Sequence, residues 1–205
     1  MTRGGAPRHR SRTAGAGPPL PAAGTSLAVL VFVMPRPRYI FVFLLFVSVL
    51  QCAFYYPRLP ATVASHFDGS GYPNDWSSKT FFFGIILAMT AMNAFVFLLM
   101  PRWFPRFSQE RMNLPHKNYW LAPERVVETH HYIQHQMLWF GVATMALMIG
   151  VTQLAIKANL STQPTLAPDA FWMLMAYFGF VVIWLARFFT HFFAKPGAEV
   201  KNDGA

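Results

Sequence analysis

Residues 81–100 read FFFGIILAMTAMNAFVFLLM, a run of twenty residues without one ionised side chain. A helix rises about 1.5 Å per residue, so about twenty apolar residues span the hydrocarbon core of a bilayer. The run does not alternate between apolar and polar residues, as a strand of a membrane barrel would. This stretch therefore predicts a transmembrane helix and places the chain among integral membrane proteins.

Three further apolar runs accompany it, and together they predict spans at about 39–56, 80–100, 137–156 and 170–189. The whole chain of 205 residues is 54% hydrophobic and only 12% charged, about half the charged fraction of an ordinary soluble domain. The expected fold is an all-α membrane protein, a bundle of four transmembrane helices. An ordered outer loop should join the first and second helices.

The net charge of +9 comes from basic residues that lie between and beside the apolar runs. The segment between spans two and three alone contains Arg102, Arg106, Arg111, Lys117 and Arg125. This distribution follows the positive-inside rule, and it excludes a nucleic-acid-binding reading of the charge. We therefore expect the lipid bilayer as the environment, with both termini cytoplasmic and the loop after span one outside.

The two ends of the chain differ in composition from the rest. Residues 1–33 combine scattered arginines with Gly, Ala, Pro and Ser, which is typical of a disordered basic arm. Translation from Met34 is the alternative, in which case this arm is not made. Residues 34–194 form the predicted transmembrane domain, and residues 195–205 a disordered tail. Cys52 is the single cysteine and excludes an internal disulfide.

The loop after span one is rich in Gly, Pro, Asn and Asp, residues that form tight turns. Asp68 and Asp75 are expected to accept hydrogen bonds from nearby backbone amides, because the spacing of a calcium-binding EF-hand is missing. His66 either senses external pH, contacts a ligand, or anchors the turn by a hydrogen bond beside Trp76. The stretch 62–67 is either a strand or an interfacial turn.

The same loop carries a dense pattern, here named the outer-loop motif: Pro57, Leu59, Pro60, His66, Phe67, Asp68, Gly71, Pro73, Trp76, Ser78 and Lys79. It resembles a bacterial family of membrane proteins known only as domain of unknown function 1648, the domain that begins the SdpI-like immunity and signalling proteins. The resemblance implies a multi-pass protein of the bacterial cytoplasmic (inner) membrane. It also implies a non-enzymatic immunity, sensing or regulatory role, with a protein or peptide partner at the outer loop. The Gly-x-Arg-Thr signature of the second SdpI domain is absent from the sequence.

A second hypothesis rests on Glu124, Glu128, His131 and His135, which follow i, i+4, i+7, i+11 spacing. On one helix these side chains share a face, and imidazoles one turn apart with carboxylates are ligands for zinc or another divalent ion. A metal-binding membrane enzyme or metal-handling protein is therefore the alternative function. The competing interpretation is a polar helix face turned to water and headgroups, with no cofactor.

The spans themselves contain few polar groups. Asn93, near the middle of span two, is expected to hydrogen-bond to another helix, with Thr144, Thr152 or Gln153 as partners. An ion-coupled transporter needs ionisable side chains at mid-depth, and the four predicted spans have none there. The sequence therefore argues against that class of protein.

Overall fold

The computed structural model of the chain describes residues 1, 37–101, 103 and 112–194. The chain divides into two units, Met1–Met34 and Pro35–Ala205, and the description that follows concerns the second. The predicted basic arm, the alternative start at Met34 and the predicted tail from residue 195 onward lie outside the described residues.

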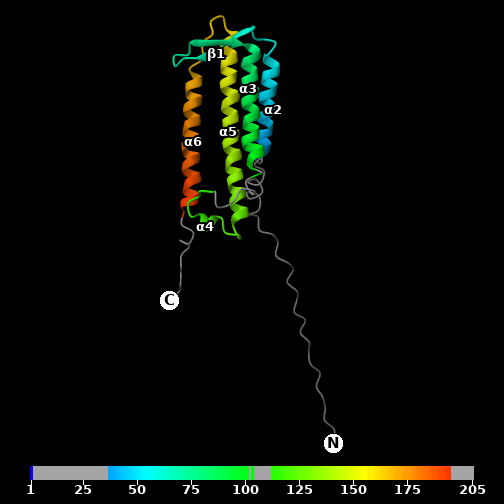
Figure 1. Cartoon of the computed structure of the whole chain (residues 1–205), viewed down its shortest axis with the longest axis vertical. Helices are drawn as coiled ribbons and strands as arrows, with labels where there is room; N and C mark the ends of the chain where they lie inside the picture. Colours follow the sequence, from blue (N-terminus) through cyan, green and yellow to red (C-terminus); the bar gives the residue numbers. More distant parts are fainter. Residues whose placement is uncertain (2–36, 102, 104–111, 195–205) are drawn as a thin grey trace. The chain divides into compact units, whose positions relative to one another are not determined.

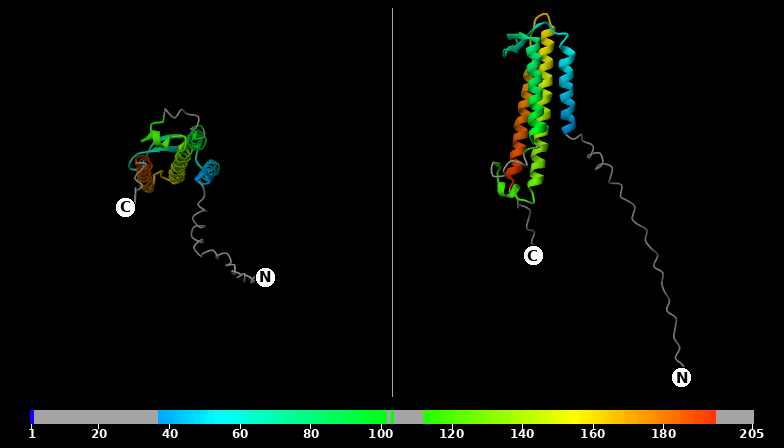
Figure 2. Two further views of the ribbon diagram at one scale, coloured as in Figure 1. Left: turned by 90° about the horizontal axis from the view of Figure 1, so that it is seen from below. Right: turned by 45° about the vertical axis from the view of Figure 1, so that its right-hand side comes forward.

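Four helices in the described part of the chain are long and apolar enough to cross a membrane. They are α2 (Pro37–Tyr55), α3 (Lys79–Ala94), α5 (Val126–Leu160) and α6 (Asp169–Phe193), with α3 prolonged by one π-helical segment, η2 (Phe95–Leu99). The helices run side by side along one direction (Figures 1 and 2). The predicted four-helix multi-pass membrane fold is confirmed.

A small antiparallel hairpin lies across one end of these helices (Figure 1). Its strands are β1 (Thr62–Phe67) and β2 (Pro73–Ser78). The short helix α4 (Lys117–Trp120) lies at the opposite end, together with the end of α6, while α2 begins short of that end. We call these the hairpin end and the α4 end. The ordered loop predicted between the first two spans is thus a hairpin.

Helix α5 is longer than the predicted span 137–156. It begins at Val126 and runs without a break to Leu160, a length of 35 residues. Pro123 and Glu124 lie in turns before the helix. At about 1.5 Å per residue α5 is about 50 Å long, which exceeds the hydrocarbon core. Polar turns of α5 therefore extend beyond the apolar span.

The core lies where α2, α3 and α5 meet below the hairpin. Its buried residues are Cys52, Leu59, Val63, Phe83, Ile86 and Ile156. Cys52 is a buried free thiol, as its apolar surroundings in the sequence suggested. Because two of these residues, Leu59 and Val63, belong to the hairpin and its approach, the hairpin is part of the core.

Hydrogen bonds between side chains connect the helices inside the apolar region. Ser48 on α2 bonds to Thr90 on α3 at 2.9 Å, and Gln51 donates to Oε1 of Gln153 on α5 at 2.9 Å. Such bonds are worth about 0.5–2 kcal/mol each within a bilayer. They explain why these polar residues occur within apolar helices.

Asn93 bonds differently from the expectation. Its Nδ2 donates to the Met89 carbonyl at 3.0 Å and to the Met148 sulfur at 3.1 Å. Thr144 instead bonds to the Tyr177 hydroxyl on α6 at 2.8 Å. Asn93 therefore links α3 to α5 through a sulfur acceptor, which a search for polar partners in the sequence overlooks.

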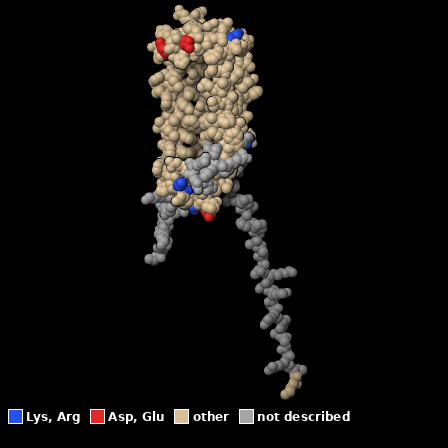
Figure 3. Space-filling model, viewed as in Figure 1, with Lys and Arg blue, Asp and Glu red and all other residues tan. Residues whose placement is uncertain are grey.

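Ionised side chains gather near the two ends of the helices. The face in Figure 3 has an uncharged surface between them, as a bilayer-facing wall requires. In α6 none of the residues in the most apolar window is buried, whereas 17–22% are buried in the other three spans. Helix α6 therefore packs on the bundle along a narrow seam and leaves most of its surface to lipid.

Candidate functional site

The turn of the hairpin is held by Asp68. Its Oδ1 accepts from the backbone N–H groups of Ser70 and Tyr72, both at 2.9 Å. Asp75 acts similarly and accepts from the N–H of Trp76 at 2.8 Å. The expectation that these carboxylates bond to nearby amides is confirmed. The bond between Asp68 and Ser70 has the spacing of an Asx turn, in which a short carboxylate substitutes for a backbone acceptor.

Gly71 joins this turn to the loop before α6. Its φ is +84°, in the region that glycine adopts without strain. Its carbonyl accepts from the N–H of Leu166 at 2.8 Å. A Cβ at Gly71 would lie 2.8 Å from the Leu166 carbonyl oxygen. Glycine is thus required here for both its backbone angle and its lack of a side chain.

Asn159, in the last turn of α5, connects the bundle to the hairpin. Its Oδ1 accepts from the N–H of Ala64 at 2.7 Å, and its Nδ2 donates to the Ala64 carbonyl at 2.9 Å. The Nδ2 also donates to the Ala155 carbonyl at 2.9 Å. The register of the hairpin is irregular after Ala64, between the pairs Ala64–Trp76 and His66–Asp75. The amide of Asn159 therefore satisfies a strand residue at the irregularity.

The base of the hairpin is closed by residues at the start of α3. Ser78 caps this helix and accepts from the N–H of Phe81 at 3.2 Å. Lys79 donates through Nζ to the Leu59 carbonyl at 3.2 Å, and its N–H donates to Ala61 at 2.9 Å. Leu59 itself is 3% exposed. These motif residues have clear roles in building the hairpin.

His66 and Trp76 differ from the other motif residues. Both side chains are exposed, Trp76 to 50%, and neither makes a side-chain hydrogen bond with the described residues. The alternative in which His66 anchors the turn by a hydrogen bond is therefore not what the structure shows. Two residues of the outer-loop motif are thus left without a structural role.

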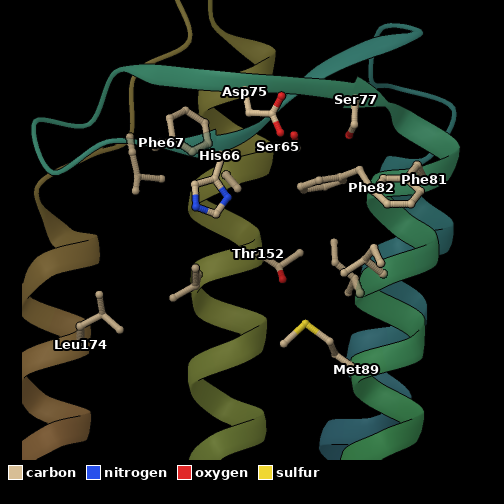
Figure 4. A pocket seen from close by; sticks show the side chains of 15 residues that line it. Ser65, His66, Phe67, Asp75, Ser77, Phe81, Phe82, Met89, Thr152 and Leu174 are labelled. Carbon is tan, nitrogen blue, oxygen red and sulfur yellow. The ribbon is translucent and has the colours of Figure 1, made fainter.

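A pocket of about 670 Å³ opens beneath the hairpin, between α3 and α6 and in front of α5 (Figure 4). This volume is in the range of small-molecule sites in proteins. The imidazole of His66 hangs from the hairpin into it, and Asp75 and Ser77 lie above (Figure 4). Met89 and Leu174 are at the bottom in Figure 4. The pocket is therefore polar at the hairpin and apolar farther down.

One carboxylate lines the pocket, and the other charged side chains named at the hairpin end lie outside its lining. Asp75 lines it, and Asp68 and Asp169 lie in the turn of the hairpin and at the start of α6. Lys79 lies away from it, with its Nζ over the Tyr56 ring at 5.1 Å from the centroid. Figure 3 shows acidic side chains at the hairpin end on the α6 side and a basic one on the α2 side. The mouth of the pocket is therefore acidic.

The residues of the metal hypothesis lie at the α4 end. Glu124 is in a turn before α5, whereas Glu128, His131 and His135 are on the helix. The helical spacing that relates Glu124 to the others therefore does not apply. Among the described residues, no group of three or more His, Cys, Asp or Glu side chains is placed to hold a metal ion. The hypothesis gains no support here and remains a prediction for elemental analysis.

Sequence reasoning did not single out Asn159, and it considered Thr152 only as a partner of Asn93. Asn159 is separated from Ala64 by 95 residues, and Thr152 lines the pocket from the last third of α5. Asn159 follows Lys157, so it falls in what the apolar pattern marked as a loop. A buried asparagine at the end of a long helix is the signal that could have found it.

Residues 43–91 match the model of the family described as domain of unknown function DUF1648. The matched segment contains most of α2, the hairpin and most of α3, including the entire outer-loop motif. The resemblance is confirmed for this segment, while the link to SdpI-like proteins remains a prediction. A search of curated proteins and a search of solved structures gave no significant match. Over residues 43–91, which lie in the first two spans and the hairpin between them, the chain is therefore similar to the family described as domain of unknown function DUF1648.

Proposed function

We propose that this membrane protein has a non-enzymatic sensing, immunity or regulatory role, and that its hairpin recognises a protein or peptide. The observation that supports this role is the division of the outer-loop motif. Asp68, Gly71, Ser78 and Lys79 hold the hairpin, while Trp76 is exposed on it and the exposed imidazole of His66 projects into the pocket beneath it. Exposed aromatic and imidazole side chains on a rigid scaffold are typical recognition residues.

The hairpin is proposed to face the outside of a bacterial cytoplasmic membrane. In the sequence the basic segment 102–125 separates the second span from the third, and its described residues Lys117 and Arg125 lie in and shortly after α4. At the hairpin end Arg58, Lys79 and Lys157 are matched by Asp68, Asp75 and Asp169. The positive-inside rule therefore favours an α4 end in the cytoplasm.

Rigidity supports recognition because a preorganised surface loses little conformational entropy on binding. The hairpin is held from three sides: by Asn159 on α5, by Leu166 before α6 and by Lys79 at the start of α3. A loop that only connects two helices needs no such hydrogen bonds to neighbouring elements, so their presence supports a binding role for the hairpin.

The test places a photo-crosslinking amino acid at Trp76 in intact cells, with the same residue at Lys117 on α4 as the control. We expect a discrete adduct from position 76 alone, and we expect a His66→Ala change in the same chain to reduce it. In parallel, a Trp76→Ala, His66→Ala chain should fail to restore a response lost on deletion of the gene. Full complementation by that double variant, together with an adduct insensitive to His66, would refute the proposal.

A further inference from the structure

The pocket beneath the hairpin is elongated, polar at its top and mostly apolar below. A protein that binds at the hairpin surface would not occupy it. It extends along α3 from Phe81 to Met89, eight residues apart, or about 12 Å down the helix axis. It opens sideways, on the face that Figure 3 shows hollowed below the hairpin, and so toward the bilayer. Its contents are therefore exchangeable with the surrounding lipid.

The lower part of the pocket suits a hydrocarbon chain. Its walls come from three helices: Ile85 and Met89 from α3, Val151 and Ala155 from α5, and Leu174 from α6. Thr152 adds a hydroxyl to this part of the wall. Walls that are apolar apart from this group favour a flexible apolar occupant over water.

The upper part suits a head group that donates hydrogen bonds. Asp75 contributes a carboxylate, Ser65 and Ser77 contribute hydroxyls, and His66 projects beneath them (Figure 4). None of the described residues that line the pocket is Lys or Arg, and Lys79 is turned to the Tyr56 ring. An ammonium group is therefore favoured at this mouth and an anionic head without an amine is disfavoured.

We propose that the pocket binds one hydrocarbon chain of an amine-headed membrane lipid, of the phosphoethanolamine type, with its ammonium group at the Asp75 carboxylate. The polarity of the pocket then follows that of the lipid, with the head at the interface and the chain toward the bilayer centre. The bound head group then lies beside the imidazole of His66, at the hairpin that is proposed to contact the partner. The inference depends on the proposed function only for this last step, since binding itself is measured on the purified protein.

The test titrates the full chain, purified in a non-ionic detergent, with three single-chain amphiphiles of equal chain length. These carry phosphoethanolamine, phosphocholine or phosphoglycerol heads, and binding is followed by native mass spectrometry. The choline head has no N–H donor, so we expect the Kd for phosphoethanolamine to be about tenfold lower than for the other two. Equal affinities for the three heads, a preference for phosphoglycerol, or no binding of any would overturn the proposal.

Two pairs of variants locate the binding. Ala155→Phe fills the pocket from α5 and should abolish binding, whereas Ala53→Phe makes the same change on α2, outside this pocket, and should leave it intact. Asp75→Asn should reduce the head-group preference to under about twofold, while Asp169→Asn should retain it. Equal effects within either pair would refute the site.

A second pocket-filling variant distinguishes a loss of binding from a loss of the fold. Leu174→Trp closes the same space from α6 without changing α5, and its thermal unfolding temperature can be compared with that of the parent. Undiminished binding in a folded Leu174→Trp protein would contradict the assignment. Failure of this binding leaves the hairpin crosslinking result unchanged, so the two proposals fail separately.

Discussion

The two ends of the bundle are built by different means. At the hairpin end, backbone and amide hydrogen bonds from Asn159, Gly71 and Lys79 hold a two-stranded cap above an open pocket. At the α4 end, aromatic rings fill the space between α4, α5 and α6. Trp120 and Tyr132 both contact the ring of His191. The distance between ring centroids is 4.9 Å for Trp120 and 3.9 Å for Tyr132, and the Tyr132 and His191 rings are stacked.

This difference assigns different roles to the two ends: the α4 end stabilises the bundle, and the hairpin end can bind a ligand. Hydrogen bonds hold the backbone of the hairpin in place without filling the space beneath it. The hairpin end is therefore rigid and still contains a pocket. Stacked rings stabilise by occupying volume, so the α4 end closes the bundle. Trp120 also donates through Nε1 to the Phe192 carbonyl at 3.2 Å, and Thr129 donates to the Trp120 carbonyl at 2.7 Å. The α4 end is therefore an anchor, and the hairpin end is the one able to accept a ligand.

The largest effect is expected from Asn159→Ala, which leaves the N–H and carbonyl of Ala64 unpaired. Because buried unsatisfied groups cost about 1–3 kcal/mol each, we expect a loss of about 3 kcal/mol. Unfolding in mixed detergent micelles measures it. Asn93→Ala, which loses a bond within its own helix and a bond to the weak sulfur acceptor of Met148, serves as the control and should cost less than about 1 kcal/mol. Equal losses in the two variants would mean that the hairpin is not held through Asn159.

Trp120→Ala should have the next effect, a loss of about 2 kcal/mol, because the ring is half-buried among aromatic neighbours. The same unfolding assay measures it. Trp120→Phe keeps a ring and loses only the Nε1 hydrogen bond, so it should cost about 1 kcal/mol. Binding at the hairpin end should be unchanged in both. Altered binding there would show that the two ends are coupled, contrary to the comparison.

Gly71→Ala should lower the free energy of unfolding by about 1–2 kcal/mol, because it places a side chain at positive φ and against the Leu166 carbonyl. Gly69→Ala is the matched control in the same turn, since a Cβ there meets nothing within 4 Å. Thermal unfolding of the two variants in parallel gives the answer. Identical curves for both would show that the contact with Leu166 does not constrain the hairpin.

His66→Ala should have the smallest effect on stability, within about 0.5 kcal/mol, since the exposed imidazole makes no hydrogen bond with the described residues. Its effect should instead appear in the crosslinking yield at Trp76. Stability is read from thermal unfolding of the purified protein. A loss as large as that of Asn159→Ala would make His66 a structural residue and remove the division of the motif.

The sequence predicts the four helices well because each apolar run is close to the thickness of a bilayer, a local property of the chain. The turn chemistry of Asp68 and Asp75 is also local and is predicted correctly. What the sequence leaves out depends on distant contacts. The bonds of Asn159 to Ala64 cross 95 positions, and the pocket combines residues of three helices and a hairpin. No periodicity encodes such pairs.

The start of α5 also depends on a contact between distant residues, and the sequence pattern does not predict it. Pro123 is suited to a first helical turn, yet the helix begins at Val126 because Leu121 and Ala122 form turns against α4. That shift removes Glu124 from the helix face on which the metal hypothesis placed it. Docking of α4 on Phe192 near the end of α6, a contact 72 residues away, positions this segment.

The central claim is that the hairpin faces outward, and labelling of single cysteines in intact cells tests it most directly. Ser70→Cys in the turn and Lys117→Cys on α4 are each exposed, while the native Cys52 is buried and serves as the background control. We predict that a membrane-impermeant maleimide labels Cys at position 70 in intact cells, and position 117 only after permeabilisation. The reverse pattern would place the hairpin in the cytoplasm and contradict the account.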